Sequence, residues 1–305
     1  MLIGRVILGI NNIFTVECHE ERYECRIKGK ILKDVVGAYN PLAVGDLVNF
    51  ELDEHHPGKG MILSRKERKN FFARWNKKRR APQTICANLD QVLCVTSPES
   101  PPFRPRFIDR VVIAAEQGNV PMAIVVNKID QNIDENMQIR LHHFEQLGIP
   151  IYYCSAKQGT GMETLEKAIF GKYTAFVGQS GVGKSSILNA LEPGLKLQVG
   201  QLNEKYNRGN HTTCFAVEVS QINEAGIVDT PGIRELEVSE LESDDLVHHF
   251  EEFIPYISEC GFQPCTHTHE PKCAVKKAVE SGLILEDRYL SYCNIFDSLK
   301  EHQKW

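Results

Sequence analysis

Long hydrophobic runs are missing from this 305-residue chain. The longest, such as VVIAA at 111–115, are far too short to span a bilayer. The N-terminal stretch MLIGRVILGINN alternates apolar and polar residues, which favours a first strand over a signal peptide, and no small-residue cleavage site follows it. Internal repeats and low-complexity segments are absent too. These absences argue against membrane, exported and repeat proteins, so we expect a cytoplasmic protein.

The chain also has little excess of one sign of charge: its net charge is −5. The chain as a whole therefore does not have the composition of a nucleic-acid binder. The charge is unevenly distributed, however. Residues 65–80, RKERKNFFARWNKKRR, hold nine Lys or Arg against one Glu, and residues 235–252 are strongly acidic. A basic segment and an acidic segment offset each other in the total.

Ten cysteines in a long chain without an export signal favour free thiols or metal ligands over disulfides. Seven of them are scattered, and we expect them to be buried as small hydrophobic residues: Cys18, Cys25, Cys86, Cys94, Cys154, Cys214 and Cys293. The other three are Cys260, Cys265 and Cys273, in the pattern C-x4-C-x-H-x5-C. Three thiolates and one imidazole make a closed tetrahedral zinc site of the structural type. Spacing alone accepts either His267 or His269 as the fourth ligand.

The pattern of strands and helices divides the chain into four parts. Short alternating runs with turns in residues 1–70 predict an all-β barrel, for which five strands suit an OB-fold, with an SH3-like barrel as the alternative. Residues 71–82 read as a basic linker. Strands alternate with helices over 83–235, which predicts an α/β domain with a parallel sheet covered on both faces. Residues 236–305 are predicted to form a helical zinc-binding domain.

The basic segment at 65–80 contains aromatic residues among its cations. Phe71, Phe72 and Trp75 are interleaved with Lys and Arg, a combination that suits stacking on bases together with phosphate neutralisation. We therefore interpret this segment as RNA-binding. A solvated linker is the alternative.

A phosphate-binding loop is indicated by the match to G-x-x-x-x-G-K-[ST]. Strand-like YTAFV precedes it and helix-like SSILNAL follows, so backbone N–H groups and the helix dipole would favour phosphate. Lys184 would contact the β- and γ-phosphates, and the Ser185 hydroxyl would bind Mg²⁺. A Gly-rich turn before a helix is the alternative. The nucleotide-binding residues predicted here are Gly178, Gln179, Ser180, Gly181, Val182, Gly183, Lys184, Ser185 and Ser186.

Two further segments are predicted to sense the γ-phosphate. Asp229-Thr-Pro-Gly232 closes the strand AGIV, so the Asp229 carboxylate can hold Mg²⁺ through water and the Gly232 N–H can contact the γ-phosphate. The HTT segment supplies a hydroxyl, from either Thr212 or Thr213, that would complete the Mg²⁺ shell.

Guanine recognition is predicted from Asn127-Lys-Ile-Asp130, which follows apolar AIVV. The Asp130 carboxylate can accept hydrogen bonds from guanine N1–H and its exocyclic amine, whereas adenine lacks that donor pair. Ser155-Ala-Lys157 follows another strand and offers a backbone N–H toward guanine O6. The residues predicted to bind guanine are Asn127, Lys128, Ile129, Asp130, Ser155, Ala156 and Lys157.

The order NKID, SAK, GQSGVGKSS, HTT, DTPG resembles that of the circularly permuted GTPases. With a barrel in front and a Cys/His module behind, nearly the whole chain resembles the RsgA (YjeQ) family of small-ribosomal-subunit-biogenesis GTPases. That resemblance implies an N-terminal OB-fold barrel, a circularly permuted α/β P-loop GTPase domain and a C-terminal helical zinc domain with His267 as a ligand. It also implies late maturation of the 30S subunit, binding to the decoding region of its 16S rRNA, and GTP turnover stimulated by the subunit. We expect a monomer.

Hydrolysis raises a separate question, because Ras-like enzymes place a water-orienting Gln just after D-x-x-G. Ile233 occupies that position here and cannot form a hydrogen bond, so we expect slow intrinsic hydrolysis and an active site that a partner completes. His211 is the candidate for orienting or deprotonating water. Lys184, through its phosphate contacts, is the second candidate catalytic residue. The permutation puts the C-terminal module directly after DTPG, which suggests that γ-phosphate binding acts on that module.

Two other functions are compatible with some of these features. A non-catalytic RNA-binding scaffold that uses GTP only as a conformational ligand would explain Ile233. A metabolic P-loop kinase or ATPase would share the phosphate loop, but NKID with SAK opposes it.

Overall fold

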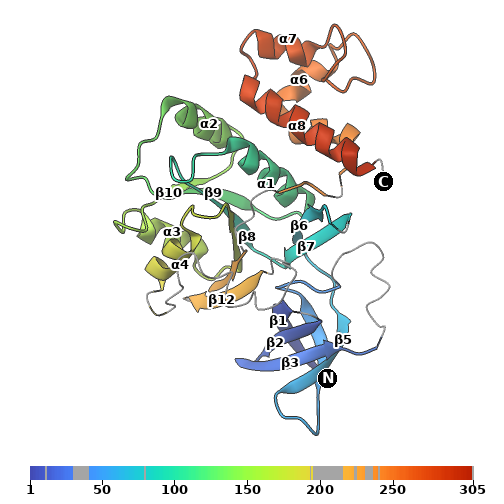
Figure 1. Ribbon diagram of the computed structural model, residues 1–305, viewed down its shortest axis with the longest axis vertical. Coiled ribbons are helices and arrows are strands. Elements are labelled where there is room, and N and C mark those ends of the chain that lie inside the picture. The colour runs from blue at the N-terminus through green and yellow to red at the C-terminus, as the bar shows by residue number, and fades with distance from the viewer. Residues whose placement is uncertain are drawn as a thin grey trace.

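The computed structural model describes residues 1–10, 12–29, 41–78, 80–192, 194, 216–222, 225–230, 236–239 and 241–303. Figure 1 shows three units that follow one another along the long axis: a barrel, a central α/β unit and a helical C-terminal unit. Among the described residues, no helix combines the length and the apolar character needed to span a membrane.

The N-terminal unit is a closed five-stranded barrel of strand order β1-β2-β3-β5-β4. Its inward side chains, such as Val16, Val48, Phe50 and Ile62, are fully buried, which explains the alternating apolar pattern of the sequence. The predicted barrel is confirmed. Its strands are β1 (Leu2–Ile10), β2 (Ile13–Cys18), β3 (Glu21–Ile27), β4 (Leu47–Leu52) and β5 (Lys59–Arg65).

The expected linker at 71–82 is instead most of an antiparallel hairpin, formed by β6 (Phe71–Asn76) and β7 (Ala81–Ala87). Phe72 pairs with Cys86, and both are fully buried in the core of the central unit. Phe72 is therefore not available to stack on RNA, because burying it stabilises the fold. Lys77, Lys78 and Arg80 remain exposed near the turn.

A six-stranded sheet of order β10-β9-β8-β11-β13-β12 forms the centre of the molecule. Five strands are parallel, as predicted, but β12 runs antiparallel to β13. Only two residues separate these two strands, and a parallel pair would need a long crossover. The strands are β8 (Gln91–Thr96), β9 (Met122–Val126), β10 (Ile151–Tyr153), β11 (Thr174–Gly178), β12 (Val217–Ile222) and β13 (Ala225–Asp229).

Helices cover both faces of this sheet. Helices α1 (Pro105–Gln117) and α2 (Glu135–Gln146) share one hydrophobic cluster, to which Val111, Leu141 and Phe144 contribute. Helices α3 (Met162–Ile169) and α4 (Lys184–Leu191) contribute Leu165, Ile169 and Ile187 to a second cluster. The central strands β8 and β11 are consequently buried along their whole length, as in other parallel sheets.

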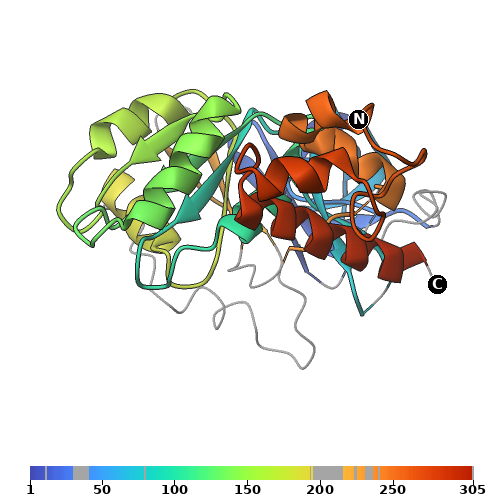
Figure 2. The same ribbon diagram turned by 90° about the horizontal axis from the view of Figure 1, so that it is seen from above.

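The C-terminal unit packs against α1 of the central unit (Figures 1 and 2). Its core contains Phe250, Phe253 and Tyr292, and also includes Ile113 of α1 and Val238. Short helices η1 (Ser243–His249), η2 (Glu251–Phe253) and α6 (Ile254–Ile257) precede α7 (Ala274–Glu280) and the long α8 (Glu286–Gln303).

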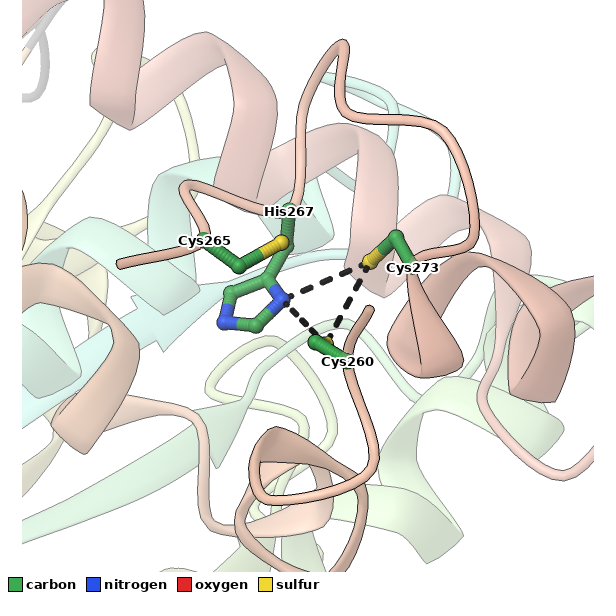
Figure 3. A group of neighbouring side chains, drawn as sticks. All are labelled: Cys260, Cys265, His267 and Cys273. Atoms are coloured by element: carbon green, nitrogen blue, oxygen red, sulfur yellow. Dashed lines mark hydrogen bonds between the residues drawn. The ribbon is translucent and has the colours of Figure 1, made fainter. Parts of the chain in front are cut away.

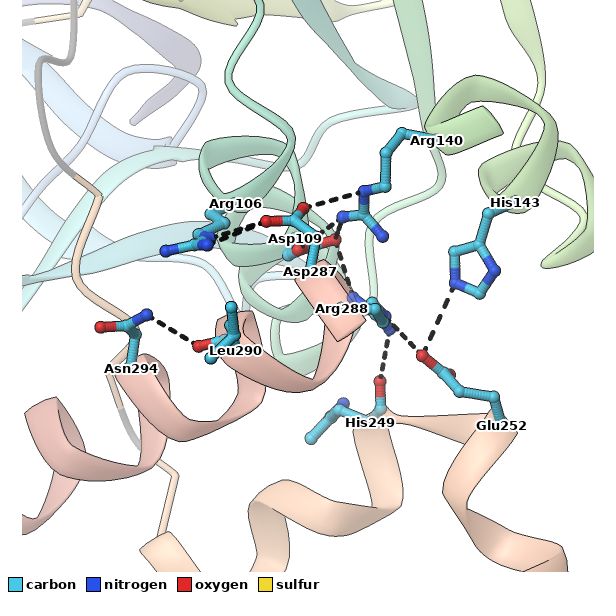
Figure 4. A network of polar contacts seen from close by, with 10 residues as sticks. All are labelled: Arg106, Asp109, Arg140, His143, His249, Glu252, Asp287, Arg288, Leu290 and Asn294. Atoms are coloured by element: carbon cyan, nitrogen blue, oxygen red, sulfur yellow. Dashed lines mark hydrogen bonds and ion pairs between the residues drawn. The ribbon is translucent and has the colours of Figure 1, made fainter. Parts of the chain in front are cut away.

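Buried ion pairs connect the C-terminal unit to the central unit (Figure 4). Asp109 of α1 is fully buried and accepts hydrogen bonds from Arg140 Nη2 at 2.8 and 2.9 Å and from Arg288 Nη1 at 2.8 Å. Arg288 Nε also donates to Glu252 Oε1 at 2.6 Å. Removing one member of such a group would leave an uncompensated buried charge, so the group holds α1, α2 and α8 together.

Substitution of Glu252 tests this junction. Burial by itself would raise the pKa of Glu252, but interactions with His143 and the Arg288 guanidinium lower it to about 2. Glu252→Gln is therefore expected to reduce stability by about 3 kcal/mol at neutral pH. Because the folded-state pKa lies below the unfolded one, this stabilisation is present above about pH 4.5 and is lost as the pH falls toward 2.

Urea unfolding of the wild type and the Glu252→Gln variant measures this difference. The two curves should lie apart at pH 7 and converge as the pH approaches 2. The matched control is Glu251→Gln, at the neighbouring exposed carboxylate, which should unfold like the wild type at every pH. Equal stability of the two Gln variants at pH 7 would contradict the assignment.

Candidate functional site

The predicted phosphate loop joins the end of β11 to the start of α4. Gly181 and Gly183 have φ of 87° and 96°, a left-handed conformation that side chains other than glycine rarely adopt. A Cβ on Gly183 would also lie 2.3 Å from Asn127 Nδ2. The loop therefore packs directly on the NKID segment, 51 residues earlier in the chain than Gly178.

Lys184 is buried inside this loop. Its ammonium donates to the backbone carbonyls of Gly178 at 2.7 Å and Gln179 at 3.3 Å. Burial lowers its pKa, while the Asp229 carboxylate opposes that shift. An ammonium held at the N-terminus of α4 is placed to contact phosphate oxygens that enter the loop.

Asp229, at the end of β13, has the electrostatics of a cation site. It is 6% exposed, and its Oδ1 is buried with no hydrogen-bond partner among the described residues. Burial raises its pKa to about 6, against the opposing effect of Lys184. A buried carboxylate oxygen without a partner is suited to a hydrated Mg²⁺. Ser185, predicted as a direct Mg²⁺ ligand, is half-buried in the first turn of α4.

Asn127 and Lys128 hold the nucleotide motifs together. Asn127 Nδ2 donates to Val182 O at 2.9 Å, and its Oδ1 accepts from the Ala156 N–H at 3.1 Å. Lys128, whose φ is 64°, donates from Nζ to Gly181 O at 2.7 Å. The NKID, SAK and phosphate-loop segments thus meet at the carboxyl ends of β9, β10 and β11.

Asp130 is exposed at the mouth of this arrangement. Its Oδ1 accepts a hydrogen bond from Ser155 Oγ at 2.7 Å, and that bond is the main cause of its lowered pKa. The carboxylate is therefore ionised and oriented at neutral pH. Such an acceptor suits the donor pair of guanine.

Sequence reasoning missed the loop between β8 and α1. Lys128 Nζ also donates to Ser100 O, and Gln131 Oε1 accepts from the N–H groups of Glu99 at 3.2 Å and Ser100 at 3.3 Å. This loop therefore supports both the NKID segment and, through Lys128, the phosphate loop. The available signal was the proline-rich run SPESPP, which marks an ordered turn.

Several predicted site residues lie outside the described residues. These are the catalytic candidate His211, the Mg²⁺ candidates Thr212 and Thr213, and Gly232 of DTPG, together with Ile233 and Cys214. Their roles stay predictions. Of the other scattered cysteines, Cys293 is half-buried and the rest are buried: Cys18, Cys25, Cys86, Cys94 and Cys154.

The chain that follows DTPG is anchored before it enters the C-terminal unit. Glu237 O accepts from the Trp75 N–H at 2.9 Å, and Glu237 Oε1 lies 2.9 Å from Lys77 Nζ. Leu236 and Val238 on either side are buried. Residues 236–239 thereby link the end of the GTPase motifs to the basic hairpin β6–β7.

Cys260, Cys265, His267 and Cys273 come together in the C-terminal unit (Figure 3). One ligand atom from each lies within 4.8 Å of the other three. Cys260 Sγ is 3.9 Å from Cys273 Sγ, and His267 Nδ1 is 3.6 and 3.4 Å from these sulfurs. Tetrahedral zinc with Zn–S bonds of about 2.3 Å separates two sulfurs by about 3.8 Å, so the donor set fits Zn²⁺.

The surroundings of the cluster explain why His267 is included. Tyr289 Oη donates to His267 O at 2.9 Å, and Tyr292 Oη donates to Thr266 O at 2.8 Å, so α8 positions this turn. Glu270 accepts from Thr266 and Thr268 and closes the loop. The side chain of His269 is 78% exposed and lies outside the cluster.

Known families match both the first part and the middle of the chain. A family model described as the RsgA GTPase matches residues 65–239, and one described as the RsgA N-terminal domain matches residues 3–62. The small ribosomal subunit biogenesis GTPase RsgA 2 of Bacteroides thetaiotaomicron is 36% identical over 303 residues, covering 98% of this chain and 97% of that protein. The small ribosomal subunit biogenesis GTPase RsgA of Borreliella burgdorferi is 37% identical with the same coverage.

Solved structures share the fold over almost the whole chain. The crystal structure of YjeQ from Thermotoga maritima superposes with a TM-score of 0.70 at 35% identity and covers 98% of both chains. That of YloQ, a circularly permuted GTPase, gives a TM-score of 0.65 at 26% identity, covering 99% of this chain and 96% of the other. These likenesses confirm the predicted circularly permuted fold.

Proposed function

Because the chain belongs to the RsgA family of small ribosomal subunit biogenesis GTPases, we propose that it hydrolyses GTP as a late maturation factor of the 30S subunit. The observation that carries this function is the hydrogen bonding of Asn127. Its side chain joins the phosphate loop, at Val182 O, to the SAK segment, at the Ala156 N–H. A guanine site and a triphosphate site are thereby held as one unit.

Nucleotide binding is assigned to the three motifs that meet there. Asp130 and the backbone of Ser155–Lys157 recognise guanine, and the loop 178–186 surrounds the phosphates. Lys184 leaves the carbonyls of Gly178 and Gln179 to contact the β- and γ-phosphates. Ser185, and Asp229 through water, would hold Mg²⁺, which would supply positive charge between those phosphates. Either Thr212 or Thr213 would add a hydroxyl ligand, and the Gly232 N–H would contact the γ-phosphate.

Hydrolysis is proposed to be slow in the isolated protein and stimulated by the small subunit. Ile233 at the position of the usual Gln motivates this proposal, because its side chain cannot orient water. His211 remains the candidate for that role in the stimulated enzyme. Lys184 assists by stabilising charge on the transferred phosphoryl group.

RNA binding is assigned to the exposed cations of the β6–β7 hairpin, with 16S rRNA of the decoding region as the partner. Lys77, Lys78 and Arg80 suit phosphate contacts, and the half-buried Phe71 and Trp75 are the aromatic residues of the predicted set that remain for stacking. Because Glu237 connects this hairpin to the end of the GTPase motifs, a change in γ-phosphate contact is transmitted to the RNA-binding surface. We propose that the protein acts as a cytoplasmic monomer.

Zinc is assigned a structural role. Cys260, Cys265, His267 and Cys273 would hold one Zn²⁺ with no open position for substrate. The ion would fix the loop before α7, on which the small C-terminal core depends.

GTP turnover by the purified protein, with and without isolated small ribosomal subunits, tests the function. We expect slow hydrolysis alone and a rise of at least roughly tenfold with subunits, whereas ATP should remain inert in both conditions. Large ribosomal subunits serve as the matched control and should not stimulate. Tight binding without any stimulation would favour the non-catalytic scaffold, and equal use of ATP would favour a metabolic kinase or ATPase.

A further inference from the structure

A cavity of about 590 Å³ lies where the central and C-terminal units meet. The loop after β8, the start of α2 and the start of α8 form its walls. None of the described nucleotide-motif or zinc-cluster residues lines it. Its volume is that of an ordinary ligand site in proteins.

The walls are largely apolar. Phe103, Met137, Ile139 and Leu285 contribute side chains, and three prolines of the β8–α1 region add rigid surface. Ile139 is 45% exposed although it is a large hydrophobic residue. An exposed apolar wall inside a cavity favours an occupant with an apolar side chain.

The rim is acidic. Glu99, Asp134 and Glu286 are exposed carboxylates that line the cavity, and Asp287 adds a fourth, whose Oδ1 pairs with Arg106. Among the lining residues that the structure describes, Arg140 is the one cation, and its charge is already paired with Asp109 and Asp287. The field at the mouth therefore attracts cations and opposes phosphate groups, which distinguishes this surface from the basic hairpin.

Arg140 supplies an independent sign of an occupant. It is 5% exposed, and its Nη2 binds Asp109, but Nε and Nη1 are buried without hydrogen-bond partners among the described residues. Nε lies 3.4 Å from Asp287 Oδ2, which is likewise without a hydrogen bond there (Figure 4). Since Nε is paired with the Asp287 carboxylate, Nη1 is the donor left without a partner among the described residues. A buried guanidinium donor is costly to leave unpaired, so a carbonyl acceptor from outside the chain would stabilise it.

We propose that this cavity docks a segment of a protein partner in which a lysine or arginine stands beside an apolar residue. The apolar side chain fits between Phe103 and Ile139, the cation meets the carboxylates of Glu99 and Glu286, and a main-chain carbonyl accepts from Arg140. This goes beyond the proposed function, since it adds a protein-binding site separate from both GTP and RNA.

The test uses the full-length, zinc-loaded protein and a fluorescein-labelled peptide of alternating leucine and arginine. Fluorescence polarisation measures binding at an ionic strength of about 0.15 M, at which salt screens weak electrostatic attraction to the protein surface. We expect saturable binding that Glu99→Gln/Glu286→Gln weakens roughly tenfold, since two charge pairs are lost. Ile139→Lys, at an exposed position that should not disturb folding, is expected to weaken it about as much by placing a cation in the cavity.

The matched control is Glu20→Gln/Glu54→Gln, two exposed carboxylates of the barrel whose removal changes the net charge equally. It should leave peptide affinity within about twofold of the wild type. Equal weakening by this control would overturn the proposal, because the attraction would then be unspecific. Absence of saturable binding would overturn it too. The proposal would also fail if single-stranded RNA displaced the peptide and this displacement were lost in the Glu99→Gln/Glu286→Gln variant, because the cavity would then bind RNA.

Discussion

Replacing Lys184 by alanine is expected to lower the rate of GTP hydrolysis by roughly 10²–10³-fold, in line with removal of a single preorganised donor. The reason lies in where the ammonium is held. It is buried at the start of α4 and, among the described residues, donates to carbonyls of the phosphate loop, so it can turn to phosphate without crossing solvent. Steady-state turnover with and without small subunits, together with equilibrium binding of a GTP analogue, measures the loss.

The matched control for this substitution is Lys167→Ala. Lys167 lies on α3 of the same unit, its side chain is 75% exposed, and it pairs with Glu163 at the surface. Turnover of that variant should stay within about twofold of the wild type, since exposed pairs contribute little. A turnover rate of the Lys184→Ala variant equal to that of the wild type would contradict the proposed role of the phosphate loop in hydrolysis.

Removal of zinc is the second change with a large expected effect. Structural Zn²⁺ binding is worth on the order of 10 kcal/mol, so chelation or Cys273→Ser is expected to unfold the C-terminal unit. Cys273 immediately precedes α7, and His267 is held by Tyr289 of α8, so a bound ion would stabilise both helices. Zinc content of the purified protein and hydrogen exchange of α7 and α8, before and after chelation, measure the effect.

Cys293→Ala is the matched control for the zinc site. Cys293 is a half-buried thiol of the same unit that lies outside the cluster. That variant should keep its zinc and its exchange protection, apart from a small packing loss. Protection of α7 and α8 that is unchanged in Cys273→Ser would contradict a structural role for the metal.

The sequence by itself determined the elements whose chemistry is local. A phosphate loop needs a strand before it, a helix after it and glycines between, and all of these are contiguous from Tyr173 to Leu191. The NKID motif, predicted to read guanine, likewise consists of one strand and the four residues that follow it. The barrel was predictable because period-two alternation reports burial on one face of each strand.

Other features were fixed only by contacts between distant segments. Residues 71–82 have the composition of a basic linker, yet they contain β6 and the start of β7 of a hairpin, with Phe72 buried in the core. Spacing left His267 and His269 equivalent as the fourth member of the Cys/His cluster, and the turn held by α8 brings His267 into it. Both the hairpin and the choice of His267 depend on tertiary packing, which cannot be predicted from local composition.

The junction between the central and C-terminal units was the least predictable part. Asp109 and Arg288 are 179 positions apart, and no periodic pattern links them, yet their ion pair joins α1 to α8. The cavity lined by Arg140 and Glu286 lies where α2 and α8 meet, and Asp109 of α1 links these two helices by pairing with both Arg140 and Arg288. Ion pairs between remote residues follow from how whole units pack, so a sequence reveals the charges but not their partners.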